Sequence, residues 1–187
     1  MVSIQETALA GVVILTPRRF RDDRGWFAES WNRRSLAEHG LEVDFVQDNH
    51  SYSAMAGTLR GLHYQAPPHA QDKLVSCTAG AVRDVAVDVR KGSPSYGNWV
   101  MTELSAENGK QLLVPQGFLH GFVTLLPDSE VHYKCSDYYA PECDGAVRWD
   151  SLKIDWGLDE DPVLSAKDAA APSFEDWVSP FGWEGDR

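Results

Sequence analysis

Short segments in which apolar and polar side chains alternate recur along the whole chain, and turn residues separate them. In residues 82–89, Val85, Val87 and Val89 point to one side of an extended chain, and the residues between them point to the other. Further strands are expected at residues 26–31, 73–77, 99–104, 111–114, 122–126 and 130–135. Many short strands with little helix between them predict an all-β fold, an antiparallel jelly-roll barrel.

Helix is expected only in a few short pieces, mainly near the C-terminus. One piece is predicted at residues 33–39, where Gly40 is placed to end it. Residues 78–81, Thr-Ala-Gly-Ala, predict a hairpin turn between the strands on either side. Beyond Trp149 the alternation weakens, which predicts surface loops or a short helix. No linker or repeat divides the 187 residues, so we expect one domain over residues 1–187 with a sizeable core.

The formal net charge of −11 argues against non-specific binding to nucleic acid or to an anionic membrane. The longest early apolar run, residues 8–15, is too short to span a bilayer and lacks the basic flank of a signal peptide. Cys77, Cys135 and Cys143 form no CxxC pair and favour free thiols in a reducing cytoplasm. We therefore expect a cytoplasmic protein without nucleic-acid or membrane partners. A small anionic ligand stays compatible, because a few arginines can make a local positive pocket.

One short motif resembles the second half of the cupin signature, PxGxxH. It is Pro-Gln-Gly-Phe-Leu-His at residues 115–120, in which the turn directs the histidine into a barrel. Residues 61–65 stand in the place of the first half, where metal-binding cupins have HxH followed downstream by a glutamate. Here Gln65 replaces the second histidine, and Lys73 stands at the downstream polar position. Two neutral histidines beside an ammonium group make a poor site for iron, manganese or zinc, so we expect no metal and no other cofactor.

A series of segments resembles the dTDP-4-dehydrorhamnose 3,5-epimerase family over nearly the whole chain. The segments are residues 23–29, 45–51, 60–65, 71–75, 84–90, 115–122, 133–141 and 164–168. The resemblance implies a cupin-type jelly roll and a cofactor-independent isomerase. Its implied reaction inverts C3 and C5 of dTDP-4-dehydro-6-deoxy-D-glucose to give dTDP-4-dehydro-L-rhamnose, a step in dTDP-L-rhamnose biosynthesis.

Epimerisation beside a ketone requires a base, a group that stabilises the enolate oxygen, and an acid on the opposite face. The resemblance implies that His63 is the base and that Asp168 pairs with its imidazole. It likewise implies that Lys73 faces the forming oxyanion and that Tyr133 is the acid. An imidazole with a reference pKa of about 6.5 is largely neutral at pH 7, and a phenol with one of about 10 is protonated. From the residues alone, Asp168 has no signal that singles it out, and the other three have ordinary structural interpretations.

The resemblance also implies contacts with the nucleotide and the sugar. The residues concerned are Arg24, Phe27, Glu29, Gln47, Asn49, Arg60, His120, Tyr139, Asp144 and Lys167. The two arginines offer planar guanidinium groups suited to phosphate oxygens, and Tyr139 corresponds to the aromatic residue that stacks on thymine. At Asp144 the family usually has glutamate, so the reach there is one methylene shorter. Asp84 is expected either to orient one of the histidines or to be an ordinary solvated aspartate.

The family is dimeric and exchanges N-terminal strands between subunits. For this chain the resemblance therefore implies a homodimer in which Arg24, Phe27 and Glu29 serve the neighbouring pocket.

Four other functions stay open from the sequence. An epimerase that inverts only C3 or only C5 of a related nucleotide 4-keto-6-deoxysugar would share the base and much of the pocket. A 3,4-ketoisomerase on the same barrel would move the carbonyl group instead. A metal-dependent cupin oxygenase or isomerase would hold iron or manganese at His63 and His120. A non-catalytic sugar-nucleotide-binding protein would retain the base, the acid and the lysine without using them.

Overall fold

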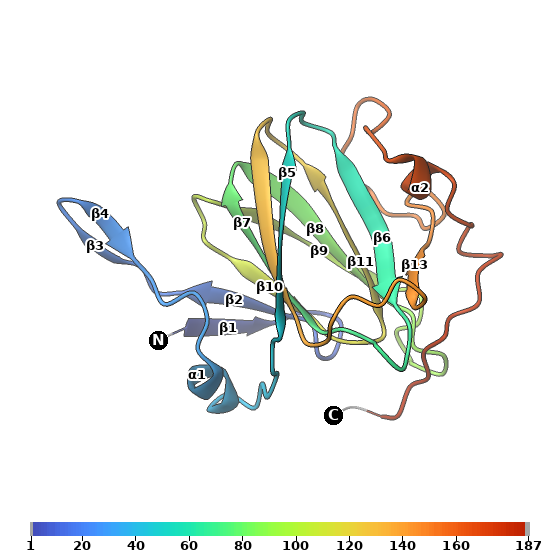
Figure 1. The fold of residues 1–187 in the computed structure, drawn as a ribbon, viewed down its shortest axis with the longest axis horizontal. Helices are drawn as coiled ribbons and strands as arrows, with labels where there is room; N and C mark the ends of the chain where they lie inside the picture. Colours follow the sequence, from blue (N-terminus) through green and yellow to red (C-terminus); the bar gives the residue numbers. More distant parts are fainter. Residues whose placement is uncertain (1, 186–187) are drawn as a thin grey trace.

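The computed structural model describes residues 2–185, and two antiparallel β-sheets pack against each other in it (Figure 1). In order across the first sheet, the strands are β1 (Val2–Glu6), β2 (Val13–Pro17), β10 (Gln111–Val114), β7 (Lys73–Ala79), β12 (Ser129–Cys135) and β5 (Gln47–Ser53). The second sheet contains β13 (Asp144–Ala146), β6 (Leu59–Gln65), β11 (Phe118–Thr124), β8 (Ala81–Asp88) and β9 (Trp99–Ser105). The expected all-β jelly-roll architecture is confirmed. Among the described strands, the two sheets are not hydrogen-bonded into a closed cylinder.

The main core lies between the two sheets. Val75 and Leu112 contribute to it from the six-stranded sheet, and Ala86 and Phe122 contribute from the five-stranded sheet. The alternation predicted for residues 82–89 is confirmed, because Val85 and its apolar partners pack into a second core on the outer face of the five-stranded sheet. Strand β8 is thus buried on both faces.

The predicted hairpin between residues 73–77 and 82–89 is wrong. Strand β7 pairs with β10 and β12, whereas β8 pairs with β11 and β9, so the two strands belong to different sheets. The chain passes from one sheet to the other at Gly80, whose φ of 71° lies in the left-handed region. Both strands carry apolar residues that pack in the core between the sheets, and the crossover puts them on opposite sides of that core.

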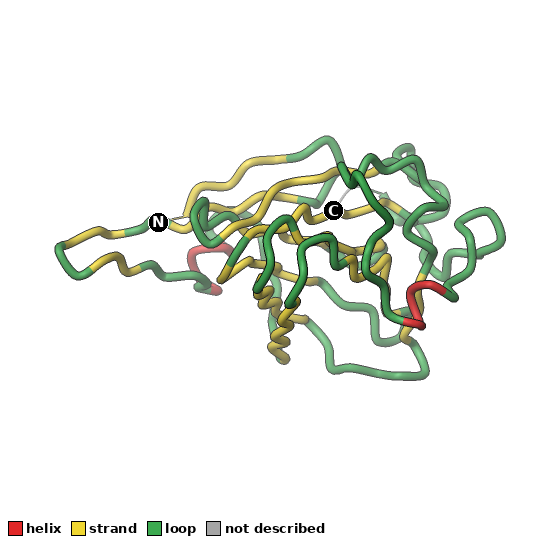
Figure 2. The backbone as a smooth tube through the Cα atoms, turned by 90° about the horizontal axis from the view of Figure 1, so that it is seen from above, coloured by secondary structure: helices red, strands yellow, loops and turns green. Residues whose placement is uncertain are grey.

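The helix predicted at residues 33–39 is observed as α1 (Arg33–Ala37). Asn32 caps its N-terminus by accepting hydrogen bonds from the backbone N–H groups of Arg34 and Ser35. The helix ends before the expected boundary, with Glu38 as its C-cap. The second helix, α2 (Ala166–Ala169), is shorter still, and Figure 2 shows both helices as small red pieces. No described helix is long and apolar enough to cross a membrane.

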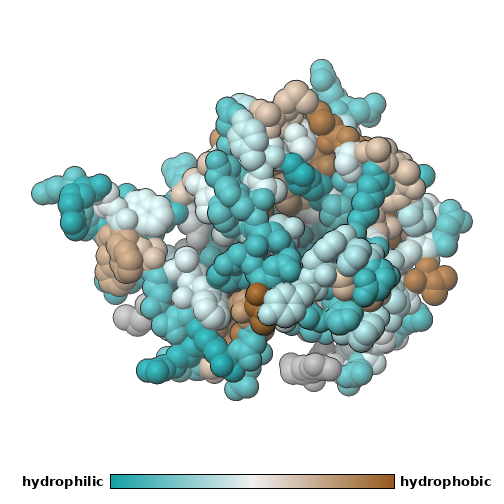
Figure 3. Space-filling view, in the orientation of Figure 1, coloured by the Kyte–Doolittle hydropathy of each residue, from teal (hydrophilic) through white to brown (hydrophobic). Residues whose placement is uncertain are grey.

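The strand predicted at residues 26–31 is largely absent. Only Gly25–Phe27 forms a strand, β4, and it pairs with β3 (Phe20–Asp22) in a two-stranded hairpin. This hairpin projects from the body of the molecule, at the left in Figures 1 and 3. Phe27 is 71% exposed and Trp26 is 52% exposed, so the alternating pattern does not mark a buried face within this chain.

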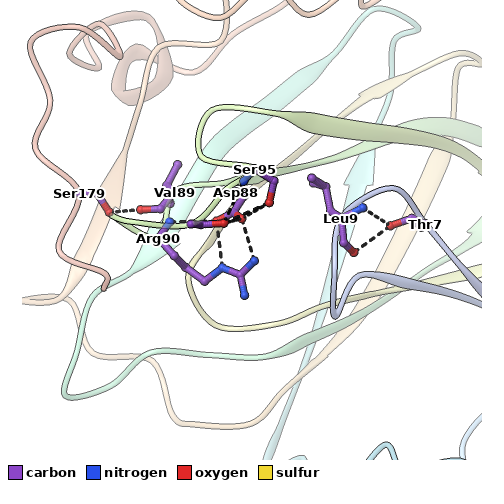
Figure 4. A network of polar contacts seen from close by, with 8 residues as sticks. Thr7, Leu9, Asp88, Val89, Arg90, Ser95 and Ser179 are labelled. Carbon is purple, nitrogen blue, oxygen red and sulfur yellow. Dashed lines mark hydrogen bonds and ion pairs between the residues drawn. The ribbon is translucent and has the colours of Figure 1, made fainter. Parts of the chain in front are cut away.

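Residues beyond Trp149, expected to form surface loops or a short helix, cover the second core. Trp156 and Phe181 are nearly fully buried there against the outer face of the five-stranded sheet. Part of this segment is tied to the end of β8: the backbone N–H of Lys91 donates to the carbonyl of Phe181, and the Ser179 hydroxyl donates to Val89 (Figure 4).

A buried carboxylate organises the same region. Asp88 accepts hydrogen bonds from the Arg90 guanidinium and from the hydroxyl groups of Ser93 and Ser95, at 2.6–2.9 Å (Figure 4). Burial alone would raise the pKa of Asp88, but these hydrogen bonds outweigh it and lower the pKa to about 2. Asp88 therefore stays ionised in its buried position.

Candidate active site

A cavity of about 220 Å³ opens between the sheets at one end. The residues that line it are Ser51, Arg60, His63, Lys73, His120, Phe122, Tyr133, Ser165, Lys167 and Asp168. They come from β5, β6, β7, β11, β12 and the segment around α2. Arg60, Lys73 and Lys167 give this cavity three cationic side chains. An anionic ligand is therefore compatible with a protein of net charge −11.

His63 and Asp168 form a close pair in the cavity. The Nε2 atom of His63 lies 2.5 Å from Oδ1 of Asp168, whose side chain is 4% exposed. The Ser165 hydroxyl donates to the other carboxylate oxygen at 2.9 Å. Burial would raise the pKa of Asp168, but the hydrogen bond and charge of His63, the Ser165 hydroxyl and the nearby Lys167 lower it below its usual value. The carboxylate is thus held ionised beside the imidazole.

His120 lies directly opposite His63 in the pairing of β11 with β6. Its Nε2 atom lies 3.0 Å from both oxygens of Asp84, and both side chains are almost completely buried. The aspartate thus orients a histidine, one of the two expectations from the sequence. Each of the two cavity histidines therefore has its own buried carboxylate.

Two glycines bring β6 and β11 unusually close beside these histidines. Gly61 has a φ of 132°, and a Cβ atom there would lie 2.6 Å from the Cα atom of Gly121. Real Cβ atoms do not make a backbone contact this short. Glycine is therefore required at position 61 both by the backbone conformation and by the lack of space for a side chain. The close approach sets the separation of the strands that carry His63 and His120.

Lys73 and Tyr133 enter the cavity from the six-stranded sheet. Desolvation lowers the pKa of Lys73, and the negative charges of Asp144 and Asp84 oppose this only in part. Desolvation raises the pKa of Tyr133, so its phenol keeps its proton at neutral pH. The two sheets thus supply different groups to one cavity: the five-stranded sheet contributes the two imidazoles and the Arg60 guanidinium, and the six-stranded sheet contributes an amine and a phenol.

A hydrogen-bonded chain of side chains continues from the cavity toward the surface. Tyr139 donates its backbone N–H to Gln47 at 2.9 Å, and the Gln47 amide donates to Asn49 at 3.1 Å. The Tyr139 hydroxyl donates to Asp144 at 3.3 Å, and Lys167 also pairs with Asp144. Asp144 therefore contacts both Tyr139 and Lys167. Five predicted binding residues are joined in this way.

Arg60 is held in place by the neighbouring strand. Its Nε atom donates to the Ser53 hydroxyl at 3.2 Å, and one terminal nitrogen donates to the carbonyl of Tyr52 at 2.9 Å. These bonds fix the orientation of the guanidinium group at the cavity.

Gln65 has a structural role. Its amide nitrogen donates to the carbonyl groups of His69 and Tyr138, and its oxygen accepts from the backbone N–H of Ala140. These bonds fix the loop after β6. The side chain that replaces the second histidine of a metal-binding cupin is therefore committed to the backbone, and the donor set around His63 does not fit a cupin metal centre.

The cavity does not include Arg24, Phe27 and Glu29. Arg24 lies in the projecting hairpin, where its side chain is 90% exposed and pairs with Asp22 at 2.6 Å. Phe27 is exposed on the same hairpin, and Glu29 follows it. Within one chain, these three predicted binding residues do not join the other predicted site residues.

Sequence reasoning missed three residues that line the cavity: Ser51, Phe122 and Ser165. Ser165 caps α2, with its hydroxyl accepting from the backbone N–H of Asp168. A serine followed three positions later by an acidic residue is a helix-start signal. That pattern, at residues 165–168, was available in the sequence and would have pointed to Ser165.

The model of the dTDP-4-dehydrorhamnose 3,5-epimerase family matches residues 6–176. A curated enzyme of that name from Salmonella typhimurium is 50% identical over 175 residues, which cover 92% of this chain and 95% of the relative. The crystal structure of the 3,5-epimerase RmlC from Legionella pneumophila, in complex with dTDP-4-keto-L-rhamnose, has a TM-score of 0.90 and 45% identity, with 94% of each chain covered.

A more distant structure is that of ChmJ, a 3'-monoepimerase from Streptomyces bikiniensis, crystallised with dTDP. It has a TM-score of 0.84 and 32% identity, covering 90% of this chain and 85% of ChmJ. That crystal holds a double mutant in which a histidine is replaced by asparagine and a tyrosine by phenylalanine. The two mutated positions are separated by the same number of residues as His63 and Tyr133. By its sequence and its fold, this chain belongs to the dTDP-4-dehydrorhamnose 3,5-epimerase family.

Proposed function

We propose that the protein epimerises C3 and C5 of dTDP-4-dehydro-6-deoxy-D-glucose and releases dTDP-4-dehydro-L-rhamnose, for dTDP-L-rhamnose biosynthesis. One observation carries this proposal: the His63–Asp168 pair and Tyr133 line the same cavity from opposite sheets. A base and an acid that face each other across a sugar ring are what inversion at carbon needs. The relative from Legionella pneumophila binds dTDP-4-keto-L-rhamnose, which supports this choice of ligand.

His63 is the base in this mechanism, and Asp168 is its partner. A carboxylate at Nε2 favours the neutral tautomer with its proton on that nitrogen, so the lone pair that takes the substrate proton is on Nδ1. The same carboxylate stabilises the imidazolium that forms. Its lowered pKa supports the role, because Asp168 is then ionised throughout the neutral range.

Lys73 stabilises the enolate oxygen at C4. Burial disfavours its ammonium group, as the lowered pKa indicates. A developing negative charge nearby offsets that cost, so the interaction strengthens as the proton leaves carbon. The substrate's own ketone provides the acidity, and no cofactor takes part.

Tyr133 returns a proton from the face opposite His63. Its raised pKa keeps the phenol protonated until the enolate carbon accepts the proton. His120, oriented by Asp84, hydrogen-bonds the sugar.

The nucleotide extends from the cavity along the hydrogen-bonded chain of side chains. Arg60 and Lys167 bind phosphate oxygens, Tyr139 stacks on the thymine, and Gln47 and Asn49 provide amides to the nucleoside. Asp144 positions Lys167 and Tyr139 together.

The active unit is a homodimer in which the β3–β4 hairpin of each subunit reaches the neighbour's pocket. Large exposed side chains on a projecting hairpin support this arrangement, because Phe27 is 71% exposed and Trp26 is 52% exposed within the described chain. Arg24 and Glu29 then complete the neighbour's nucleotide site. Each subunit is proposed to be one domain, which is supported by the five-stranded sheet that both apolar cores share. Three free cysteines agree with a cytoplasmic setting for this reaction.

A single-carbon epimerase is the second candidate, because the 3'-monoepimerase ChmJ has the same fold. Incubation with dTDP-4-dehydro-6-deoxy-D-glucose in D₂O, followed by NMR, separates the two. We expect deuterium at both C3 and C5 and an L-rhamno product. Deuterium at one carbon only would contradict the 3,5-epimerase and indicate the single-carbon epimerase. A carbonyl group moved to C3 would indicate a ketoisomerase, and no exchange at carbon would contradict all three.

A further inference from the structure

The outer face of the six-stranded sheet carries two histidines and a glutamate at its β5 edge. His50 lies on β5 and is the direct cross-strand partner of His132 on β12. Glu130 is two residues before His132, so it lies on the same face. The adjacent residues Asn49 and Tyr133 belong to the opposite, inner face, where Tyr133 lines the catalytic cavity. This cluster is therefore separated from the active site by the thickness of one sheet.

The three side chains already converge. The rings of His50 and His132 are stacked, with their centroids 3.7 Å apart and their planes at 23°. The Nε2 atom of His50 lies 2.9 Å from a carboxylate oxygen of Glu130. One possible ligand atom from each residue lies within 4.8 Å of the others. Ligand atoms about 2.1 Å from a tetrahedral ion are roughly 3.4 Å apart, so the two imidazole rings must turn out of their stacked arrangement for all three ligand atoms to reach that spacing and point at one ion.

We propose that His50, Glu130 and His132 bind a zinc ion on this face, with water at the remaining position. Two imidazoles and one carboxylate are a donor set that zinc prefers, and a ligand position open to solvent accepts water. The surrounding charges favour a cation. Lys134, the nearest ammonium along β12, is neutralised by Asp48 at 2.9 Å, and Asp128 lies close enough to accept a hydrogen bond from Tyr52.

Zinc at this site would join two neighbouring strands. Among the described strands, β5 is an edge strand of its sheet and pairs only with β12. A metal ion that binds His50 and His132 fixes β5 on β12 by two coordinate bonds in addition to the ladder. Because a native-state ligand stabilises the fold by mass action, zinc is expected to raise the melting temperature by roughly 5–10 °C at about one hundred times Kd.

The test is zinc chloride titration of the protein without an affinity tag, by calorimetry at neutral pH. We expect one zinc ion per chain with a Kd in the micromolar range, together with the rise in melting temperature. In the double variant His50→Ala/His132→Ala, the affinity for zinc should fall by more than ~10–100-fold, which is the loss that removal of an outer-shell partner causes. Glu130→Gln should weaken binding and keep the fold.

His39→Ala is the matched control, since His39 is exposed after α1, away from the cluster, and should leave zinc binding unchanged. Because His63 and His120 remain in the double variant, a loss of tight binding there assigns the ion to the outer face. Unchanged tight binding in the double variant would overturn the proposal. So would the absence of stoichiometric binding by the unmodified protein.

Discussion

His63 and Tyr133 reach one cavity from two different sheets, and this separation makes their roles experimentally distinguishable. In the proposed mechanism His63 removes the proton and Tyr133 returns one from the other face. Removal of the base stops the first step, whereas removal of the acid stops only the second.

We therefore expect the Tyr133→Phe variant to exchange the carbon-bound proton of the substrate without inverting the configuration of that carbon. The ring and its packing stay, but the proton donor is lost, so His63 takes a proton and returns deuterium from D₂O to the same face. Product formation should fall by ~10²–10⁴-fold, the usual contribution of a positioned acid. The measurement is NMR of the recovered substrate, which should carry deuterium at carbon with its original configuration.

His63→Asn is the matched comparison. This variant should neither exchange nor invert, while dTDP still binds, because the residues proposed to bind the nucleotide lie elsewhere in the cavity and along its rim. If the tyrosine variant instead lost exchange as completely as the histidine variant, Tyr133 would not be the acid of a separate step.

At the scale of elements, the contact between β6 and β11 is the most constrained feature of the site. The backbones approach so closely that Gly61 has no room for a side chain. The same two strands carry His63 and His120 as direct partners. Any separation of the strands thus changes the distance between the two histidines.

Gly61→Ala should destabilise the protein by about 2–4 kcal/mol, from backbone strain at its φ of 132° and overlap with Gly121. It should also lower kcat in the fraction that stays folded. Urea denaturation and steady-state kinetics measure the two effects. Gly57→Ala is the control: its φ is 75°, and nothing lies within 4 Å of the added atom. Gly57→Ala should lower the free energy of unfolding by only about 1–2 kcal/mol. Equal losses for both variants would contradict the steric argument.

At the scale of the whole molecule, the C-terminal segment is required for burial of the second core. This segment is hydrogen-bonded to the residues that follow β8, and the hydrogen bonds of Asp88 hold those residues in place. The pKa of Asp88 is about 2 in the folded protein, against 3.8 for the ordinary group. A lowered pKa contributes stability that is complete above about pH 4 and is lost as the pH falls toward 2.

The free energy of unfolding of the Asp88→Asn variant should therefore be lower by about 2 kcal/mol at neutral pH. Between pH 4 and pH 2 it should fall less steeply than that of the unmodified protein. Urea denaturation at a series of pH values measures this. Asp150→Asn, in the exposed pair with Arg148, is the control and should change little. Parallel acid profiles for Asp88→Asn and the unmodified protein would show that another group causes the acid sensitivity.

The sequence by itself determined the strand content, the inward histidine after the Pro-x-Gly turn, and the family resemblance that named the site residues. These features depend on local patterns such as alternation along a strand or residue types at fixed spacing, which one segment displays without its neighbours. A local pattern also gave one wrong prediction. Residues 73–89 have the alternation and the turn of a hairpin, but they form strands of two different sheets.

Only the tertiary structure decided which residues meet. Asp168 reaches His63 from 105 positions away, and Asp84 reaches His120 across two paired strands. The space at Gly61 depends on Gly121, and the exposure of Phe27 and Trp26 depends on the projection of the β3–β4 hairpin from the body of the chain. Such contacts follow from how the sheets pack, and the free energy of packing is summed over the whole core. No single segment of the sequence contains that information.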